Sequence, residues 1–255
     1  MQKKIGSRLG IICLLLVTLL TGSVMLNFSL FNYSRLYYFQ LNDLRLDPLN
    51  LEFFPMEEPQ TETLNSETTH VVFFGDSRAA NWPSPSLDGF KFTNRGIGSQ
   101  TSTQVLQRYS AHVQPLYPDI LVIQVCINDL KTIPLFPEKK SDIIMDCKNN
   151  IQQIIGLARE QGAMVIITTV FPVGEYPIQR RIFWSEDIPL AIKDVNIFIK
   201  SLADDKVVVF DTFAILADEN GRLRDMYQID ELHLNTAGYD AINQEFVSLL
   251  KTIRE

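Results

Sequence analysis

HVVFFGDSRAAN, residues 70–81, takes the chain from a buried strand to the start of a helix within twelve residues. Val71 to Phe74 are β-branched or aromatic, a run typical of a strand buried in a parallel sheet. Gly75 permits a sharp turn, and Asp76 and Ser77 are residue types that begin helices. The stretch therefore predicts a strand, a tight turn and a helix, the repeating unit of an α/β domain.

The same alternation continues to the end of the chain. Four further apolar runs read as strands: FKFTN (90–94), DILVIQV (119–125), AMVIITTV (163–170) and KVVVF (206–210). Between and after them lie the predicted helices, at about 101–113, 140–161, 185–203 and 236–253. We therefore expect a parallel sheet of five strands with right-handed crossovers and its active site at the carboxyl ends of the strands. FPVGEYPIQRRIF, residues 171–183, is expected to be a long loop over that edge that shapes a substrate pocket.

The N-terminus carries a membrane signal. Lys3, Lys4 and Arg8 precede residues 9–34, which contain no charged side chain. A helix of about 20 apolar residues spans a bilayer, and positive charges before it keep that end in the cytoplasm. A cleavable signal peptide is the alternative, although Thr21-Gly22-Ser23 is a poor cleavage site. We predict a membrane-anchored protein with an extracytoplasmic domain, secreted if the segment is cleaved.

Length and charge limit the number of domains and the kinds of partner. A chain of 255 residues with 46% hydrophobic residues can bury one full-sized core beyond such a segment. We divide it into an anchor or signal segment (1–34), a juxtamembrane stalk with little regular structure (35–68) and a catalytic domain (69–255). The net charge is -7 and no basic stripe occurs, which argues against a nucleic-acid partner.

The cysteines and histidines are few. Cys13 lies in the apolar N-terminal run, and Cys126 and Cys147 fall on a predicted strand end and a predicted helix. We expect the latter two to be buried thiols, with a disulfide between them as the alternative outside the cytoplasm. Three cysteines and three histidines, scattered along the chain, predict no zinc site.

Two polar groups stand out at the ends of the domain. Ser77 follows the first strand, where unpaired N–H groups and the helix dipole surround its hydroxyl. Asp230 precedes His233 by three residues, a spacing that brings a carboxylate to Nδ1–H and leaves Nε2 free to accept a proton. Each has a simpler reading: helix capping by Asp76 or Ser77, and a capping Asp230 beside a surface His233.

Two further blocks follow the second and third strands. NRGIGSQTS, residues 94–102, bends at Gly96 and Gly98 and presents N–H groups that stabilise negative charge. It is not a dinucleotide fingerprint, because Thr101 stands where the third glycine belongs. Asn128 could donate its amide to an oxyanion, although the pair Asn128-Asp129 is also an ordinary turn former.

Together and in this order, GDS (75–77), N-x-G-I-G (94–98), I-N-D (127–129) and D-x-x-H (230–233) resemble the GDSL/SGNH hydrolase family over about residues 69 to 254. The resemblance implies a three-layer, flavodoxin-like α/β/α fold and hydrolysis of carboxylic esters, as in acyl esterases and lysophospholipases. The chain lacks the G-x-S-x-G elbow of the α/β-hydrolases.

By position, the resemblance makes Ser77 the nucleophile, His233 the general base and Asp230 the residue that orients it. The oxyanion hole would consist of the N–H groups of Ser77 and Ser99 and the side-chain amide of Asn128. No metal or cofactor is implied, and the substrate would be a small-molecule, lipid or glycan ester.

The chain departs from the family at three positions. Ser99, Cys126 and Glu231 stand where the family usually has glycine. A backbone N–H survives at Ser99, but the added side chain could narrow the pocket or alter the turn. Two other functions therefore stay open: an O-acyltransferase acting on envelope polysaccharide or lipid, and a non-catalytic binding domain of the same fold.

Overall fold

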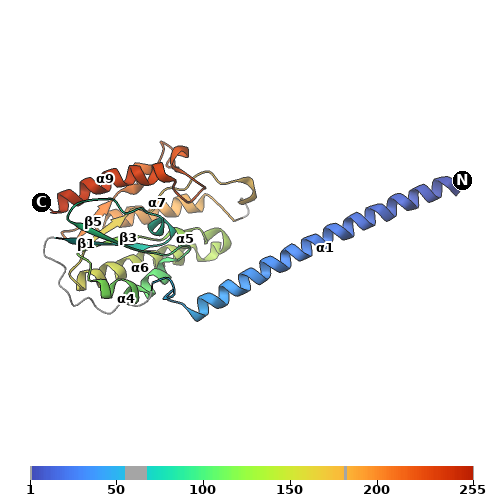
Figure 1. The fold of residues 1–255 in the computed structure, drawn as a ribbon. Coiled ribbons are helices and arrows are strands. Elements are labelled where there is room, and N and C mark those ends of the chain that lie inside the picture. The colour runs from blue at the N-terminus through green and yellow to red at the C-terminus, as the bar shows by residue number, and fades with distance from the viewer. Residues whose placement is uncertain (1, 55–67, 181–182, 255) are drawn as a thin grey trace. The chain divides into compact units, whose positions relative to one another are not determined.

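The computed structural model describes residues 2–54, 68–180 and 183–254, and the chain forms two compact units, Met1–Glu52 and Phe53–Glu255. The first is built on one long helix, α1 (Gln2–Leu46) (Figure 1). Among the helices of the described residues, only α1 is long and apolar enough to cross a membrane, over Gly10–Leu46. A signal sequence near the N-terminus meets the same criterion of length and composition.

Helix α1 is longer than we expected. Residues 35–46, for which we predicted little regular structure, continue the helix, so that expectation is wrong for them. The reason is local, because no glycine or proline occurs between Gly22 and Pro48. The residue before a proline is disfavoured in the helical conformation, so the helix ends at Leu46. Residues 55–67 of the predicted stalk lie outside the described part of the chain.

The second unit is built on a parallel sheet of five strands in the order β2-β1-β3-β4-β5, which confirms the predicted α/β fold. The strands are β1 (Thr69–Gly75), β2 (Phe90–Gly96), β3 (Ile120–Gln124), β4 (Met164–Thr168) and β5 (Val207–Phe210). All five predicted apolar runs form these strands, since buried parallel strands are nearly continuous in apolar residues.

Helices connect and cover the strands. They are α2 (Ser77–Ala80), α3 (Ser102–Gln107), α4 (Tyr109–His112), α5 (Ile127–Leu130), α6 (Lys140–Glu160), α7 (Asp187–Lys200), α8 (Thr212–Leu216) and α9 (Thr236–Arg254). Single 3-10 turns occur at Gln114–Leu116, Ile133–Leu135, Pro137–Lys139, Ile178–Arg180 and Asp225–Tyr227. The predicted helix at about 101–113 is thus two short helices, α3 and α4.

The sheet has a hydrophobic core on each face. Side chains alternate along a strand, so Val72 and Phe74 of β1 join a core with α3, α6 and α7, whereas Val71 and Phe73 join a core with α8 and α9. Figure 1 shows α6 and α9 on opposite faces of the sheet. The three layers match the architecture that the family resemblance implied.

The strand register aligns the loops that carry the chemistry. Gly75 at the end of β1 pairs with Gly96 of β2 on one side and Gln124 of β3 on the other. Strands β2, β1 and β3 therefore end level, and the loops after them share one edge. After β1 the chain forms β2 on one side of it, and then β3 on the other side. The point at which the strand order changes direction in this way is the usual place for a ligand in a parallel sheet.

Candidate active site

Ser77 is the first residue of α2, directly after the tight turn that ends β1. The turn needs glycine, because a Cβ at Gly75 would lie 1.8 Å from the carbonyl oxygen of Gln124. Asp76 caps the helix, its Oδ1 accepting a 2.9 Å hydrogen bond from the backbone N–H of Arg78. The capping role is thus taken by Asp76, which leaves the half-buried hydroxyl of Ser77 for another partner.

That partner is His233, 156 residues further along the chain. Ser77 Oγ lies 3.1 Å from His233 Nε2. On the other side of the ring, His233 Nδ1 lies 2.8 Å from Asp230 Oδ2. A proton on Nδ1 shared with the carboxylate leaves the lone pair of Nε2 facing the serine hydroxyl, the arrangement that a general base requires.

Asp230 is held as a carboxylate. Its Oδ1 accepts hydrogen bonds of 2.8 Å from the backbone N–H groups of both Leu232 and His233. Partial burial opposes ionisation, but the hydrogen bonds from His233 and these two N–H groups outweigh it, so the pKa of Asp230 lies below its usual value. The carboxylate that faces the imidazole is therefore charged at neutral pH.

The turn after β2 lies beside Ser77, and Asn128 is hydrogen-bonded to that turn. A Cβ at Gly98 would be 3.9 Å from the Ser77 Cβ, so the turn passes directly over the serine. Asn128 is buried, and its Nδ2 donates a 2.9 Å hydrogen bond to the carbonyl oxygen of Gln100. An amide nitrogen carries two donors, so the second N–H of Asn128 can serve a ligand.

Two of the positions where glycine was expected keep the backbone that glycine favours. Ser99 has φ 65° and Cys126 has φ 89°, both in the left-handed region. A non-glycine residue there is strained by about 1–2 kcal/mol. The turns are therefore kept in shape, with side chains added at some expense in stability.

The expectation of two buried thiols is wrong, because Cys126 and Cys147 form a disulfide with a Cα–Cα distance of 5.8 Å. Cys126 is the residue before α5, and Cys147 lies on the buried face of α6, which packs against α5. The bond therefore fixes the strained turn that carries Asn128 to a helix of the core.

Two buried arginines hold the site together, and sequence reasoning missed both. Arg78 is fully buried, and its Nε donates to the carbonyl oxygen of Leu232 at 2.9 Å. Arg108 donates from Nη2 to the carbonyl oxygen of Gly75 at 2.8 Å and from Nε to Gln100 Oε1 at 2.5 Å. In the sequence, only the place of Arg78 directly after the candidate nucleophile Ser77 could have indicated its role. Nothing in the sequence indicated a role for Arg108.

Burial also perturbs the acids around these arginines. Desolvation raises the pKa of fully buried Asp76 to about 6, opposed by the Arg78 charge and by the hydrogen bond from the Arg78 N–H. Burial also raises the pKa of Asp129. Ser102 opposes this shift by donating two hydrogen bonds to the carboxylate, one of 2.6 Å from its Oγ and one of 2.8 Å from its backbone N–H. Asp129 thus joins α5 to the start of α3.

Among the residues that the structure describes, no three His, Cys, Asp or Glu side chains are grouped as metal ligands would be. The side chains that the structure brings to this edge include a hydroxyl, an imidazole, a carboxylate and an amide donor, groups that can together perform acyl transfer. Ser77, His233 and Asp230 form one hydrogen-bonded chain, and Asn128 and Ser99 belong to the loops beside it.

Comparison with known proteins identifies the family of the chain. The model of the GDSL-like Lipase/Acylhydrolase family matches residues 68–241. A GDSL-like lipase from Bacteroides thetaiotaomicron superimposes with a TM-score of 0.66 at 25% identity, covering 80% of this chain and 98% of that one.

Two more distant structures share the fold. They are a lipase/acylhydrolase from Enterococcus faecalis (TM-score 0.52, 20% identity, 72% and 96% covered) and a carbohydrate acetylesterase from Sinorhizobium meliloti (0.55, 18%, 73% and 100%). No curated protein matches the chain. The family match extends over more than half of the chain, so this protein belongs to the GDSL-like lipase/acylhydrolase family and is an ester-bond hydrolase.

Proposed function

We propose that the protein hydrolyses carboxylic esters through an acyl-enzyme on Ser77, with His233 as general base and Asp230 as the group that orients it. The observation that carries this proposal is the chain of hydrogen bonds from Ser77 Oγ to His233 Nε2 and from His233 Nδ1 to Asp230. A weak nucleophile needs such a base within reach and a third group to fix the base.

In the first half-reaction, Ser77 Oγ attacks the ester carbonyl carbon while its proton moves to His233 Nε2. The carbon–oxygen bond to the alcohol then breaks, and His233 returns that proton to the departing oxygen. In the second, His233 takes a proton from water, whose oxygen attacks the acyl carbon. The bond to Ser77 breaks, the serine recovers its proton, and the carboxylic acid leaves.

The oxyanion of both steps would be stabilised by three donors: the N–H of Ser77, the N–H of Ser99 and the second amide N–H of Asn128. The first N–H groups of a helix have no partner within it, which leaves the N–H of Ser77 available. Donors fixed before the reaction need no reorganisation when charge develops, which is why such sites accelerate acyl transfer.

The experiment is hydrolysis of p-nitrophenyl acetate by the full chain in lipid nanodiscs. Ser77→Ala and His233→Ala should each reduce kcat to background, whereas Ser248→Ala, on the exposed surface of α9, should match the wild type. Equal activity of Ser77→Ala and wild type would remove the proposal, and an inactive wild type that is well folded would argue for a binding domain.

We also propose that α1 anchors the protein in a membrane with the hydrolase domain on the extracytoplasmic side. Lys3, Lys4 and Arg8 before the apolar stretch favour a cytoplasmic N-terminus. The Cys126–Cys147 disulfide supports export, since disulfides persist in oxidising compartments. Trypsin added to intact cells should digest the domain; protection until lysis would contradict this topology.

A further inference from the structure

A cavity of about 680 Å³ opens at the same edge of the sheet as Ser77. Three segments enclose it: residues 173–176 after β4, residues 184–189 around the start of α7, and residues 218–222 after α8. Ser77, His233 and Asp230 are not among its lining residues. The volume falls within the range of about 300–1,000 Å³ typical of small-molecule sites.

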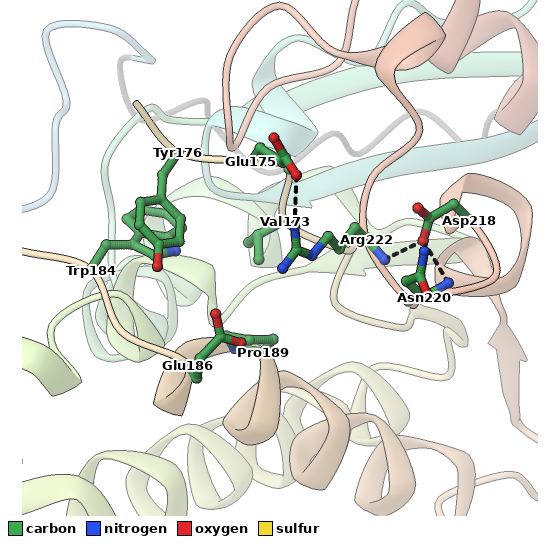
Figure 2. A pocket seen from close by; sticks show the side chains of 11 residues that line it. Val173, Glu175, Tyr176, Trp184, Glu186, Pro189, Asp218, Asn220 and Arg222 are labelled. Carbon is green, nitrogen blue, oxygen red and sulfur yellow. Dashed lines mark hydrogen bonds and ion pairs between the residues drawn. The ribbon is translucent and has the colours of Figure 1, made fainter. Parts of the chain in front are cut away.

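One wall of the cavity is aromatic. The rings of Tyr176 and Trp184 lie 5.7 Å apart between centroids and are tilted by 34°. Figure 2 shows both rings on one side of the space, facing the polar side chains. Trp184 is largely buried and its ring packs against that of Tyr176, so this aromatic surface is held in place before a ligand binds.

The opposite walls are polar. Arg222 Nη1 donates to Glu175 Oε1 at 2.8 Å, which holds the guanidinium at the cavity and leaves further N–H groups for a ligand. Glu186 stands at the N-cap of α7 but makes no capping hydrogen bond with its side chain. Figure 2 shows Glu186 and Arg222 reaching toward the space in front of the rings.

This lining selects against two ligand classes. A fatty acyl chain would desolvate Glu186 and Arg222 without replacing their hydrogen bonds. An anion would face three carboxylates, those of Glu175, Glu186 and Asp218. A neutral sugar fits, because its C–H face packs on an aromatic ring while its hydroxyls both donate and accept hydrogen bonds.

The cavity is joined to the proposed catalytic turn. The N–H of Gly174, in the cavity wall, donates a 2.9 Å hydrogen bond to the carbonyl oxygen of Glu231, the residue after Asp230. Ser77 follows β1 and the wall follows β4, and these two strands lie two positions apart in the sheet, about 10 Å from strand to strand. A ligand as long as an oligosaccharide is therefore suited to contact both the wall and the serine.

We infer that this cavity binds the sugar part of an acylated glycan whose ester group lies at Ser77. The inference rests on the proposed esterase function for the position of the ester, but not for the binding of the sugar itself. Binding and turnover can therefore be measured separately.

Binding is tested with the Ser77→Ala full chain in nanodiscs, by saturation-transfer NMR and titration with cellotetraose and N-acetylchitotetraose. At least one tetrasaccharide should bind, and Tyr176→Ala and Arg222→Ala should each weaken it about five- to tenfold. Tyr176→Phe keeps the ring and should keep binding. Arg159→Ala is the matched control, because Arg159 also forms a half-exposed ion pair, with Asp204.

Failure to bind either tetrasaccharide would overturn the inference. Binding that stays as tight in Tyr176→Ala and in Arg222→Ala as in the chain with Tyr176 and Arg222 intact would also overturn it. So would binding of tetramethylammonium or hexanoate in place of the sugars, if the same two substitutions abolished it. Because Arg222 is half-exposed, its substitution tests the site even if Tyr176→Ala does not fold.

Turnover then separates the two proposals. With otherwise wild-type protein, Tyr176→Ala and Arg222→Ala should raise the KM for acetylated cellotetraose at least fivefold more than the KM for p-nitrophenyl acetate. Hydrolysis of p-nitrophenyl acetate without this difference would contradict the sugar site alone. No hydrolysis of either ester, together with sugar binding by Ser77→Ala, would contradict the esterase proposal alone.

Discussion

Arg78 Nε donates a 2.9 Å hydrogen bond to the carbonyl oxygen of Leu232, 154 residues further along the chain. Arg78 directly follows Ser77, and Leu232 directly precedes His233, so one buried side chain ties together the backbone beside both groups. The same guanidinium donates to the carbonyl oxygens of Phe171 and Pro172, directly before the cavity wall at residues 173–176. Arg78 thus positions the serine and the imidazole relative to each other.

Arg78→Lys tests this positioning role. Lysine keeps the charge but not the planar fork that reaches three carbonyl oxygens. A misplacement of about 1 Å lowers a rate about 100-fold, so we expect kcat for p-nitrophenyl acetate to fall by about 10- to 100-fold with little change in KM. Arg159→Lys on the exposed face of α6 serves as the control. A fall in kcat no larger than the unfolded fraction of the variant would argue for a structural role only.

Asp76→Asn tests the electrostatics beneath Ser77. Burial raises the pKa of Asp76 from 3.8 to about 6, so the folded state holds this proton more tightly than the unfolded state. The contribution of Asp76 to stability is complete below about pH 4 and is lost as the pH rises to about 6. Asparagine keeps the acceptor for the N–H of Arg78 but does not titrate.

The free energy of unfolding of the wild type, relative to Asp76→Asn, should therefore decrease between pH 4 and 6 and then level off. Fluorescence of Trp82 and Trp184 during denaturation in nanodiscs gives this quantity at each pH. A difference that is constant or that increases over this range would show that Asp76 is not the perturbed group.

Asn128→Ala tests the oxyanion donor. We expect kcat to fall about 100- to 1,000-fold, because one donor to the developing charge is lost, while the KM for a small ester changes little. The hydrogen bond to Gln100 is also lost, so stability must be measured alongside. Asn149→Ala, on an exposed position of α6, is the control. A kcat within tenfold of the wild type would remove Asn128 from the mechanism.

The sequence predicts the fold well because its strands are contiguous apolar runs and its polar blocks follow them directly. Ser77, Asn128 and His233 could be singled out because each is a side chain of a distinctive type at a strand or helix end. Arg78 and Arg108 could not, because most of their partners are backbone carbonyl oxygens, which every residue carries. Such acceptors become visible only once the loops are in place.

Two other features needed the tertiary structure. The Cys126–Cys147 disulfide depends on how α6 packs against the turn before α5, and residue types alone do not give that contact. The left-handed backbone at Ser99 and Cys126 could not be predicted either, because serine and cysteine rarely adopt a positive φ, whereas glycine often does.

Replacing the disulfide gives a matched pair of variants. Cys126→Ala with Cys147→Ala should lower the free energy of unfolding by about 3 kcal/mol, the effect of opening a cross-link between residues 21 apart. Cys126→Gly with Cys147→Ala should be more stable than the alanine pair by about 1 kcal/mol, because glycine adopts φ 89° without strain. An alanine pair as stable as the glycine pair would contradict a strained turn.

The most direct test of the central claim is peptide mapping by mass spectrometry after reaction of the full chain with a fluorophosphonate. We predict one phosphonyl adduct, on Ser77, formed by the wild type and by Ser248→Ala but greatly slowed in His233→Ala. Folded wild-type protein that hydrolyses p-nitrophenyl acetate yet carries no adduct on Ser77, or carries it on another residue, would contradict the assignment of Ser77 as the nucleophile.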